Sequence, residues 1–240
     1  MGINRLLDQK IAILLINLLL TTTEENLVLI DNLNLICEED LILMNNFINP
    51  HIAKQIIIGT KSPSRRKLFH SLNLSFKFKS ANIDERKIKN INNNKYDALK
   101  IAEAKARHLT NKYRNKIIVT FDTTILFRKR TIYKCDSKKC CIKLLKDFSN
   151  KSHFLYTGMV FMINNKIIKK NLSETKIYFN KNSHQLIQSY VNKNFLKIRS
   201  AVGCYNIEGP AKEFFENIDG SFYNIIGLDI IKFLRVLKSI

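Results

Sequence analysis

The residues around position 60 combine a predicted helix start with two cations. The β-branched run Ile56–Ile58 gives way to a glycine, and Ser62-Pro63 then precedes residues whose apolar members recur at helical spacing. Serine at the N-cap and proline at the first helical position are a favoured helix start. Free N–H groups, the positive end of the helix dipole and Arg65-Arg66 would face one space, which suits a phosphate chain. An ordinary capped surface helix with solvated arginines fits the same residues, so both interpretations stay open.

A central strand is predicted to end at an aspartate. Ile117–Phe121 is a β-branched and aromatic run, and Asp122 follows it directly. In open α/β sheets the ligand crevice lies beyond the carboxyl ends of the strands. A carboxylate there can hold a divalent cation or accept a proton from water. An aspartate that only caps a turn is the alternative.

One lysine is predicted to lie on the apolar side of a helix. Ala98–Leu109 has helical periodicity, and Lys105 is four residues from both Ile101 and Leu109 on the apolar stripe. Because an ammonium group leaves water only for a partner, we favour an inward Lys105 that contacts a phosphate or a carboxylate. A side chain that snorkels at the edge of the stripe is the alternative.

These candidates belong to a chain in which strands and helices alternate from Gln55 onward. Helices are also predicted over 137–148 and 230–237, and strands over 154–163 and near 176–179. The alternation indicates the α/β class. The sequence contains no internal repeat.

The net charge of +20 raises the question of a nucleic-acid partner. The lysines are spread along the whole chain beside abundant Asn and Ile, as in 87–95 and 164–169, and form no single stripe. A general drift in composition toward Lys, Asn and Ile gives the same total. We therefore expect no dedicated nucleic-acid partner.

The five cysteines form no C-x-x-C pair. Their odd number and the length of the chain favour a reducing, cytoplasmic setting. Cys141 shares a helical stripe with Leu144, Leu145 and Phe148, which predicts core packing and makes a thiol metal site an unfavoured interpretation.

Residues 1–54 differ from the rest and are interpreted as an N-terminal extension of unclear role. The apolar run Ile11–Leu20 is interrupted by Asn17 and is shorter than the roughly 20 residues that a bilayer span needs. It also lacks a small-residue cleavage site. Membrane association is therefore the less favoured interpretation.

Several short blocks follow one another in a specific order and spacing. They are Gly59–Arg66, Ile83–Glu85, Ala102–Ala106, Phe121–Thr123, Tyr156–Gly158, Val202–Gly209 and Gly220–Leu228. Together they resemble the Maf family of nucleoside triphosphate pyrophosphatases. The resemblance covers residues 55–240, interpreted as one Maf-like domain.

The resemblance implies a Maf/ITPase-like α/β fold, with a mixed twisted sheet flanked by helices and two lobes around a deep cleft. It also implies a homodimer. The implied activity is house-cleaning hydrolysis of a nucleoside triphosphate to the monophosphate and pyrophosphate, with Mg²⁺ or Mn²⁺ as cofactor.

The resemblance also implies roles for individual residues. Asp122 would be the proton acceptor, Glu85 and Asp122 would hold the metal, and Lys105 would act beside them on the triphosphate. The implied substrate-binding residues are Ser62, Arg65, Arg66 and Lys134, and the implied specificity residues are Ser64, Thr123 and Glu208. Lys134 lies in Tyr133–Cys135, where the family has Gly-Lys-Pro.

The specificity positions combine features of two branches of the family. The branch that acts on dTTP and UTP has Arg, Lys and Gln where this chain has Ser64, Ala201 and Glu208. The 7-methyl-GTP branch shares Arg65-Arg66 and Glu208, but has an aromatic residue at position 64 and Gln at position 123. A carboxylate suits a base edge with N–H donors.

We therefore predict a chain closest to the 7-methyl-GTP branch, with a dTTP/UTP pyrophosphatase as the alternative. A catalytically weakened module that binds nucleic acid or a division protein is the alternative of another class.

Overall fold

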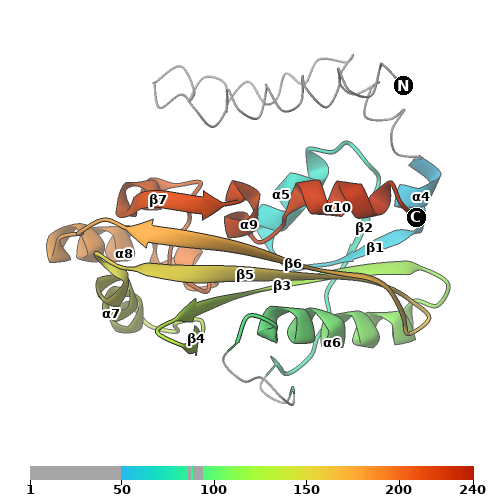
Figure 1. The fold of residues 1–240 in the computed structure, drawn as a ribbon, viewed down its shortest axis with the longest axis horizontal. Coiled ribbons are helices and arrows are strands. Elements are labelled where there is room, and N and C mark those ends of the chain that lie inside the picture. The colour runs from blue at the N-terminus through green and yellow to red at the C-terminus, as the bar shows by residue number, and fades with distance from the viewer. Residues whose placement is uncertain (1–49, 86–87, 89–93) are drawn as a thin grey trace. The chain divides into compact units, whose positions relative to one another are not determined.

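The computed structural model describes residues 50–85, 88 and 94–240. The predicted extension at 1–54 therefore lies outside the described residues except for its last positions, which begin the short helix α4 (Pro50–Gln55). The described residues form a central sheet with helices on both faces (Figure 1).

Seven strands of the described chain form one mixed sheet in the order β2-β1-β3-β5-β6-β7, and β4 pairs with the end of β3. β1 is parallel to β2 and β3, whereas the pairs β3–β5, β5–β6 and β6–β7 are antiparallel. The strands are β1 (Ile56–Gly59), β2 (Lys77–Lys79), β3 (Ile117–Phe127), β4 (Arg130–Ile132), β5 (Ser152–Ile163), β6 (Lys166–Phe179) and β7 (Phe215–Gly220). This architecture confirms the predicted α/β class with a mixed sheet.

The helices lie on the two faces of this sheet. On one side α6 runs along the sheet, and on the other side lie α5 and α10 (Figure 1). Besides α4, the helices are α5 (Pro63–His70), α6 (Asp97–Lys112), α7 (Lys138–Phe148), α8 (His184–Ile198), the 3₁₀ helix η3 (Pro210–Phe214), α9 (Phe222–Ile226) and α10 (Ile230–Leu237). The predicted helices over 137–148 and 230–237 are thus confirmed to within a residue.

Aromatic rings fill the layer between the sheet and helices α5 and α10. The ring of Phe69 in α5 packs against Phe121 of β3 and Phe233 of α10, with ring centroids 5.7 and 5.0 Å away. Phe69 and Phe233 are fully buried. This packing fixes the start of α5 relative to β3.

Strand β3 is longer than the sequence predicts. The expected end at Phe121 is wrong, because Asp122 and Thr123 continue the strand and pair with Gly158 and Thr157 of β5. β1, however, stops at Gly59, opposite Thr120. Asp122 therefore still lies beyond the carboxyl end of a parallel strand, where the crevice was expected.

The close approach of α6 to the sheet depends on Gly158. A Cβ atom at this position would lie 2.5 Å from the backbone nitrogen of Leu99 and 2.6 Å from the carbonyl carbon of Ala98. Only glycine allows the first turn of α6 to rest directly on β5. This contact sets the height of α6 above β3.

The cysteines differ from the sequence-based expectation in one respect. Cys141 is buried in a core cluster with Leu145 and Phe148, which confirms its predicted packing. Cys135 and Cys140 form a disulfide, which the predicted reducing setting does not favour. A five-residue separation brings the two Cα atoms to 5.5 Å, within the range that a disulfide spans.

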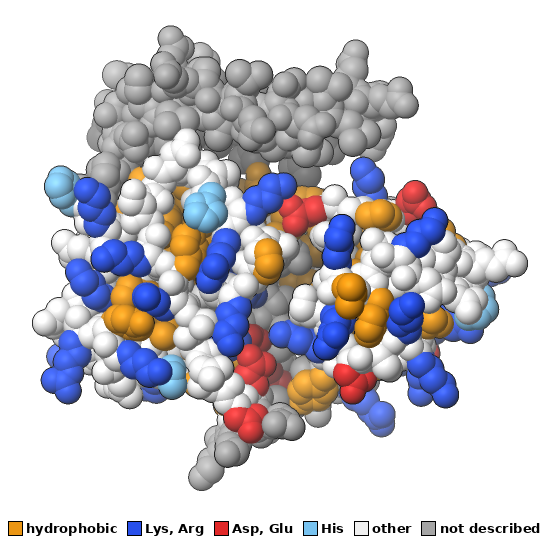
Figure 2. Space-filling view, turned by 180° about the vertical axis from the view of Figure 1, so that it is seen from behind, with side chains coloured by type: hydrophobic (Ala, Val, Ile, Leu, Met, Phe, Trp, Pro, Cys, Tyr) orange, Lys and Arg blue, Asp and Glu red, His pale blue; other side chains and the backbone are white. Residues whose placement is uncertain are grey.

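Lysine and arginine side chains are spread over the whole face seen in Figure 2 and do not gather in one stripe. Their distribution there follows the even spread of basic residues along the sequence.

Among the described helices, none combines the length and the apolar character needed to cross a bilayer.

Candidate active site

The start of α5 has the geometry that the sequence predicts. Ser62 is the N-cap, with its side-chain oxygen accepting a hydrogen bond from the backbone N–H of Arg65 at 3.4 Å, and Pro63 begins the helix. The backbone N–H of Ser62 donates to the Thr60 hydroxyl at 3.1 Å. A hydrogen-bonded turn therefore carries the chain from β1 into the positive end of α5.

Arg65 is held by two hydrogen bonds to distant segments. Its Nε donates to the carbonyl oxygen of Gly227 at 2.5 Å, and its Nη2 donates to Oγ1 of Thr123 at 2.7 Å. Burial lowers the pKa of Arg65, and the charges of Asp122 and Glu85 act against this. The two hydrogen bonds thus fix the guanidinium, which lies close enough to Asp122 and Glu85 to interact with their charges.

Gly227 is shaped for this contact. It ends α9 in the left-handed region, with a φ of 98°, and a Cβ atom there would lie 2.9 Å from Nη2 of Arg65. Glycine is the residue that adopts this conformation without steric cost. The turn after α9 therefore accommodates the guanidinium.

A lysine ammonium bridges two carboxylates on the other face of the sheet. Nζ of Lys105 lies 2.7 Å from Oε1 of Glu85 and also donates to Oδ1 of Asp122. The Asp122 side chain is only 12% exposed, whereas that of Glu85 is 44% exposed. The predicted inward Lys105 with a carboxylate partner is confirmed.

Burial raises the pKa of the Asp122 carboxyl, and the negative charge of Glu85 adds to this effect. The ammonium of Lys105 and the guanidinium of Arg65 act in the opposite direction and keep the ionised form accessible. A carboxylate with a raised pKa is a stronger base than an exposed aspartate. Asp122 is therefore suited to accept a proton.

The alternation of β3 places its two candidate residues on opposite faces of the sheet. Asp122 contacts Lys105 of α6, whereas Thr123 contacts Arg65 of α5. Consecutive strand residues must point to opposite sides. Because β1 ends short of both, the two sets of charges meet beyond its carboxyl end.

The hydroxyl group that accepts a hydrogen bond from Arg65 belongs to a longer hydrogen-bonded chain. Oγ1 of Thr123 lies 3.0 Å from Oγ1 of Thr157, which in turn donates to the carbonyl oxygen of Asn224 at 3.4 Å. The buried Asn224 amide donates to Thr175 of β6 at 3.0 Å. Sequence reasoning gave no role to Thr157, Asn224 or Gly227. The one signal for them was that they lie in blocks that resemble the family.

The other candidate residues lie outside this network. Arg66 is exposed; it donates to the carbonyl oxygen of Thr60 at 3.3 Å and lies over the Phe78 ring. Ser64 is partly buried in the first turn of α5.

Two further candidates come from later segments. Lys134 is exposed between β4 and α7, and Glu208 is exposed, with its backbone N–H donating to the Asn206 side chain at 3.1 Å. Among the described residues, neither of them hydrogen-bonds to Lys105, Asp122 or Glu85. The expected cleft between two lobes stays a prediction.

The segment that carries all of these side chains, residues 55–240, matches the family described as Maf-like protein. The chain belongs to the Maf family. A 31% identical relative is the dTTP/UTP pyrophosphatase of Clostridium botulinum (strain Okra / Type B1), over 78% of this chain and 97% of the relative. The dTTP/UTP pyrophosphatase of Pyrococcus horikoshii is also 31% identical, over 76% of this chain and 95% of the relative.

A third relative has a broader name. The nucleoside triphosphate pyrophosphatase of Ruegeria sp. (strain TM1040) is 27% identical over 78% of this chain and 96% of the relative. The predicted closeness to the 7-methyl-GTP branch is therefore wrong, because the two relatives above that are named for a base are dTTP/UTP pyrophosphatases. The features that suggested it, Arg65-Arg66 and Glu208, do not by themselves assign a branch.

The carboxylates of the Maf-family site fit a divalent cation. Asp122 and Glu85 already converge on one cation, the ammonium of Lys105. Carboxylate oxygens are the hard ligands that Mg²⁺ and Mn²⁺ prefer. These two residues are the ones that would hold the metal.

Proposed function

We propose that this chain is a nucleoside triphosphate pyrophosphatase that hydrolyses its substrate to the nucleoside monophosphate and pyrophosphate, with residues 55–240 carrying the activity. The supporting observation is the group formed by Lys105, Asp122 and Glu85 beside the fixed guanidinium of Arg65. The names of the Maf-family relatives support the same reaction.

Asp122 is the proton acceptor in this proposal. Attack of water on the first phosphate requires removal of a proton, and the raised pKa of Asp122 suits that task. Lys105 holds the carboxylate in place and leaves its positive charge near the phosphates. Cleavage builds negative charge on the phosphate oxygens, which nearby cations stabilise.

The triphosphate is bound at the start of α5. The first backbone N–H groups of the helix, the hydroxyl of Ser62 and the side chains of Arg65 and Arg66 supply donors and positive charge. Lys134 is proposed to approach the phosphates from the segment before α7. These groups orient the substrate so that its first phosphate lies near Asp122.

A divalent cation, Mg²⁺ or Mn²⁺, would be held by Asp122 and Glu85. When bound, it supplies positive charge that offsets the charge of the phosphates. Glu85 is the more exposed of the two carboxylates, so it can turn toward a cation without leaving the protein surface.

Two base preferences have support. The names of the 31% identical relatives favour dTTP or UTP. Glu208 is compatible with a second candidate, a base with N–H donors such as guanine, because a carboxylate only accepts hydrogen bonds. Ser64, Thr123 and Glu208 are the residues that we propose to set the preference.

The test is a pyrophosphate-release assay of the purified chain against dTTP, UTP, GTP and 7-methyl-GTP with Mg²⁺ or Mn²⁺. We expect pyrophosphate with at least one of them and loss of activity by at least about 10²-fold in Asp122→Asn. Asp147→Asn makes the same chemical change at an exposed position of α7 and should leave activity unchanged. Size-exclusion chromatography of the same sample tests the homodimer.

Release of orthophosphate in place of pyrophosphate would refute the proposal. Salt-sensitive binding of polynucleotides that is equal in wild type and Asp122→Asn, without hydrolysis, would instead support the binding-module alternative.

A further inference from the structure

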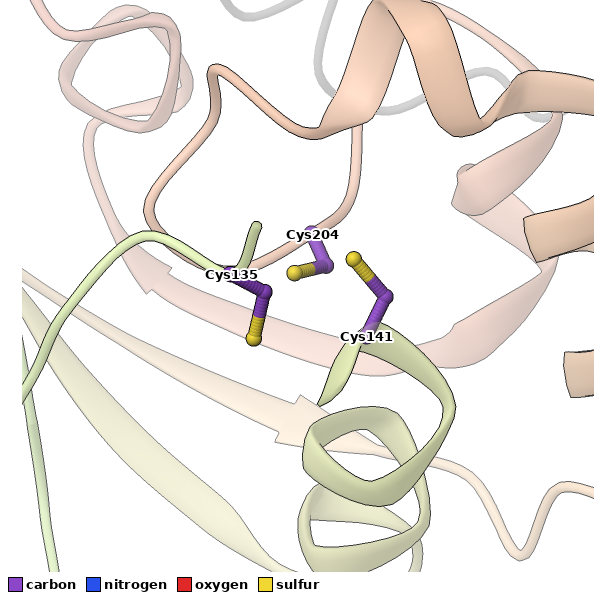
Figure 3. A group of neighbouring side chains, drawn as sticks. All are labelled: Cys135, Cys141 and Cys204. Carbon is purple, nitrogen blue, oxygen red and sulfur yellow. The ribbon is translucent and has the colours of Figure 1, made fainter. Parts of the chain in front are cut away.

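Three cysteine sulfurs from separate segments converge in the core. Cys135 lies between β4 and α7, Cys141 lies near the start of α7, and Cys204 lies in the turn after α8. Their Sγ atoms all lie within 4.8 Å of one another. Figure 3 shows the sulfurs of Cys141 and Cys204 close to each other, with the Cys135 side chain beside Cys204 and its sulfur directed away from them.

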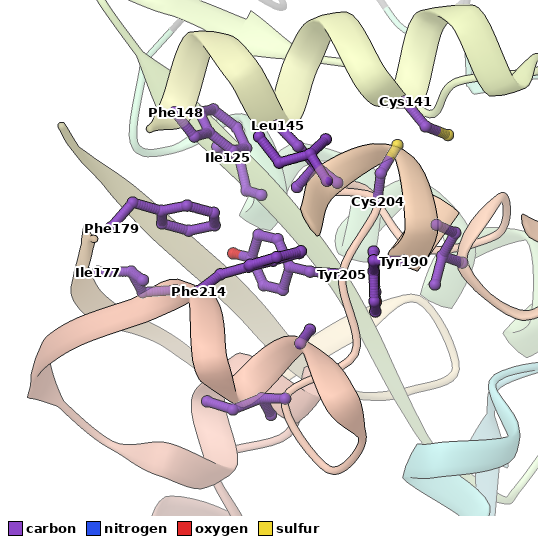
Figure 4. Close-up of a cluster of buried hydrophobic side chains, with 14 of the residues drawn as sticks. Ile125, Cys141, Leu145, Phe148, Ile177, Phe179, Tyr190, Cys204, Tyr205 and Phe214 are labelled. Carbon is purple, nitrogen blue, oxygen red and sulfur yellow. The ribbon is translucent and has the colours of Figure 1, made fainter. Parts of the chain in front are cut away.

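The surroundings exclude solvent on most sides. All three side chains are buried. In Figure 4, Cys141 and Cys204 lie at one end of a cluster of apolar and aromatic side chains that includes Leu145 and Tyr190. A metal ion bound here would be protected from exchange with water.

The backbone holds two of these cysteines in defined positions. Ser137 caps α7, an eleven-residue helix, and Cys141 is the fourth residue of that helix. Cys204 has a φ of 57°, an uncommon conformation for a residue other than glycine. The backbone N–H of Cys204 donates to the carbonyl oxygen of Ala201 at 3.2 Å, which closes the turn that carries this cysteine.

The geometry points to a metal-thiolate site. We propose that the reduced chain binds one thiophilic cation of the Zn²⁺ type through Cys135, Cys141 and Cys204. In a tetrahedral site with Zn–S bonds of about 2.3 Å, the sulfurs lie about 3.8 Å apart. Sulfurs already within 4.8 Å need to move by about 1 Å at most.

Binding is a ligand exchange without electron transfer. Three S–H bonds lose their protons to solvent and three metal–sulfur bonds form. The cation keeps one water molecule as its fourth ligand, and its other water molecules leave. Burial raises the pKa of the Cys204 thiol, so without a cation this group stays protonated. The positive charge of a bound cation would offset the cost of burying the negatively charged thiolates.

The disulfide between Cys135 and Cys140 competes with this site. Cys135 cannot offer a thiolate while it is bonded to Cys140. In the assay a phosphine reductant takes up an oxygen atom from water and leaves two thiols. Metal binding is therefore expected only after reduction.

The site would connect two segments that matter if the proposed function holds. Cys135 follows Lys134 directly, and Cys204 precedes Glu208 in the same block. A shared cation would join the segment that carries Lys134 to the segment that carries Glu208. Metal binding itself does not depend on hydrolysis, so the two proposals can fail separately.

The test measures metal content directly. The full chain, purified with the phosphine reductant and incubated with Zn²⁺, is dialysed and analysed by elemental mass spectrometry. We expect about one zinc per chain. Replacement of Zn²⁺ by Co²⁺ should give the near-ultraviolet charge-transfer absorption of cobalt–thiolate bonds. Cys204→Ser and Cys141→Ser should each lower the zinc content by at least about tenfold.

Two controls keep the result interpretable. Cys37→Ser removes a cysteine outside the described residues and should retain the zinc. The oxidised wild-type chain, which carries no substitution, should bind none and should recover binding after reduction. A reduced wild-type chain without zinc would overturn the proposal and leave the cluster as core packing. Equal zinc in Cys204→Ser, or its loss in Cys37→Ser, would overturn it as well.

Discussion

Gly158 offers the sharpest test of how the site is positioned, because α6 carries Lys105 and rests on this glycine. In Gly158→Ala the new Cβ would lie 2.5 Å from the backbone nitrogen of Leu99. Ordinary contact needs about 3.4 Å, so the first turn of α6 must move away by about 1 Å. Both contacting atoms are backbone, so no side-chain rotation relieves the overlap.

We expect this change to destabilise the chain by about 2 kcal/mol, within the range of overpacked cores. For a domain of this size, that lowers Tm by roughly 4–8 °C. A displacement of about 1 Å at Lys105 would also lower kcat/KM by up to about 10²-fold. Thermal unfolding followed by circular dichroism and the pyrophosphate assay measure the two effects.

Gly209→Ala is the matched control for stability. The nearest atom to its new Cβ would be 3.6 Å away, an ordinary contact, and its φ of −121° suits any residue. Its Tm should therefore stay within about 1–2 °C of wild type. If Gly158→Ala unfolds at the wild-type temperature, α6 does not rest on β5 as described, and the placement of Lys105 over β3 loses its support.

Three further substitutions test the two cations and the turn that contacts Arg65. In Lys105→Met the ammonium that lowers the pKa of Asp122 is lost, so this pKa should rise further. Activity should fall about 10²-fold, and on acidification the remaining activity should be lost at a higher pH than in wild type. The control Lys112→Met, on the exposed side of α6, should leave the pH profile unchanged. Arg65→Lys cannot reproduce both guanidinium hydrogen bonds, and kcat/KM should fall about 10–100-fold; an unchanged value would mean that they do not position the cation. Gly227→Ala forces alanine to a φ of 98° beside Arg65, which should cost about 1–2 kcal/mol in urea unfolding; wild-type stability would contradict the described turn.

The sequence predicts best those features that local interactions determine. The cap at Ser62 and the start of α5 at Pro63 depend on residues within one turn, so their types were sufficient. The inward Lys105 followed from helical periodicity and from the cost of removing an ammonium group from water without a partner. The alternation of strands and helices gave the α/β class for the same reason.

Features set by distant segments could not be predicted in this way. β3 continues through Asp122 because Gly158 and its neighbours pair with it. The β-branched and aromatic run at 123–127 is compatible with this longer strand, but the strand's partner and register depend on β5, which lies far away in the sequence. The carbonyl acceptor of Arg65 lies 162 residues away at Gly227. The three cysteines converge only because the turn after α8 folds back onto α7.

The arrangement of charges around β3 explains why a site of this kind needs the sheet to end unevenly. Asp122 and Thr123 are consecutive and therefore point to opposite faces, so Lys105 and Arg65 approach from opposite sides. If β1 were as long as β3, it would separate the two cations by a layer of backbone. Because β1 stops at Gly59, a triphosphate lying across its end could contact both at once. We therefore expect a substitution at either cation to impair the same step, and the double variant Arg65→Lys, Lys105→Met to lose less than the product of the single losses.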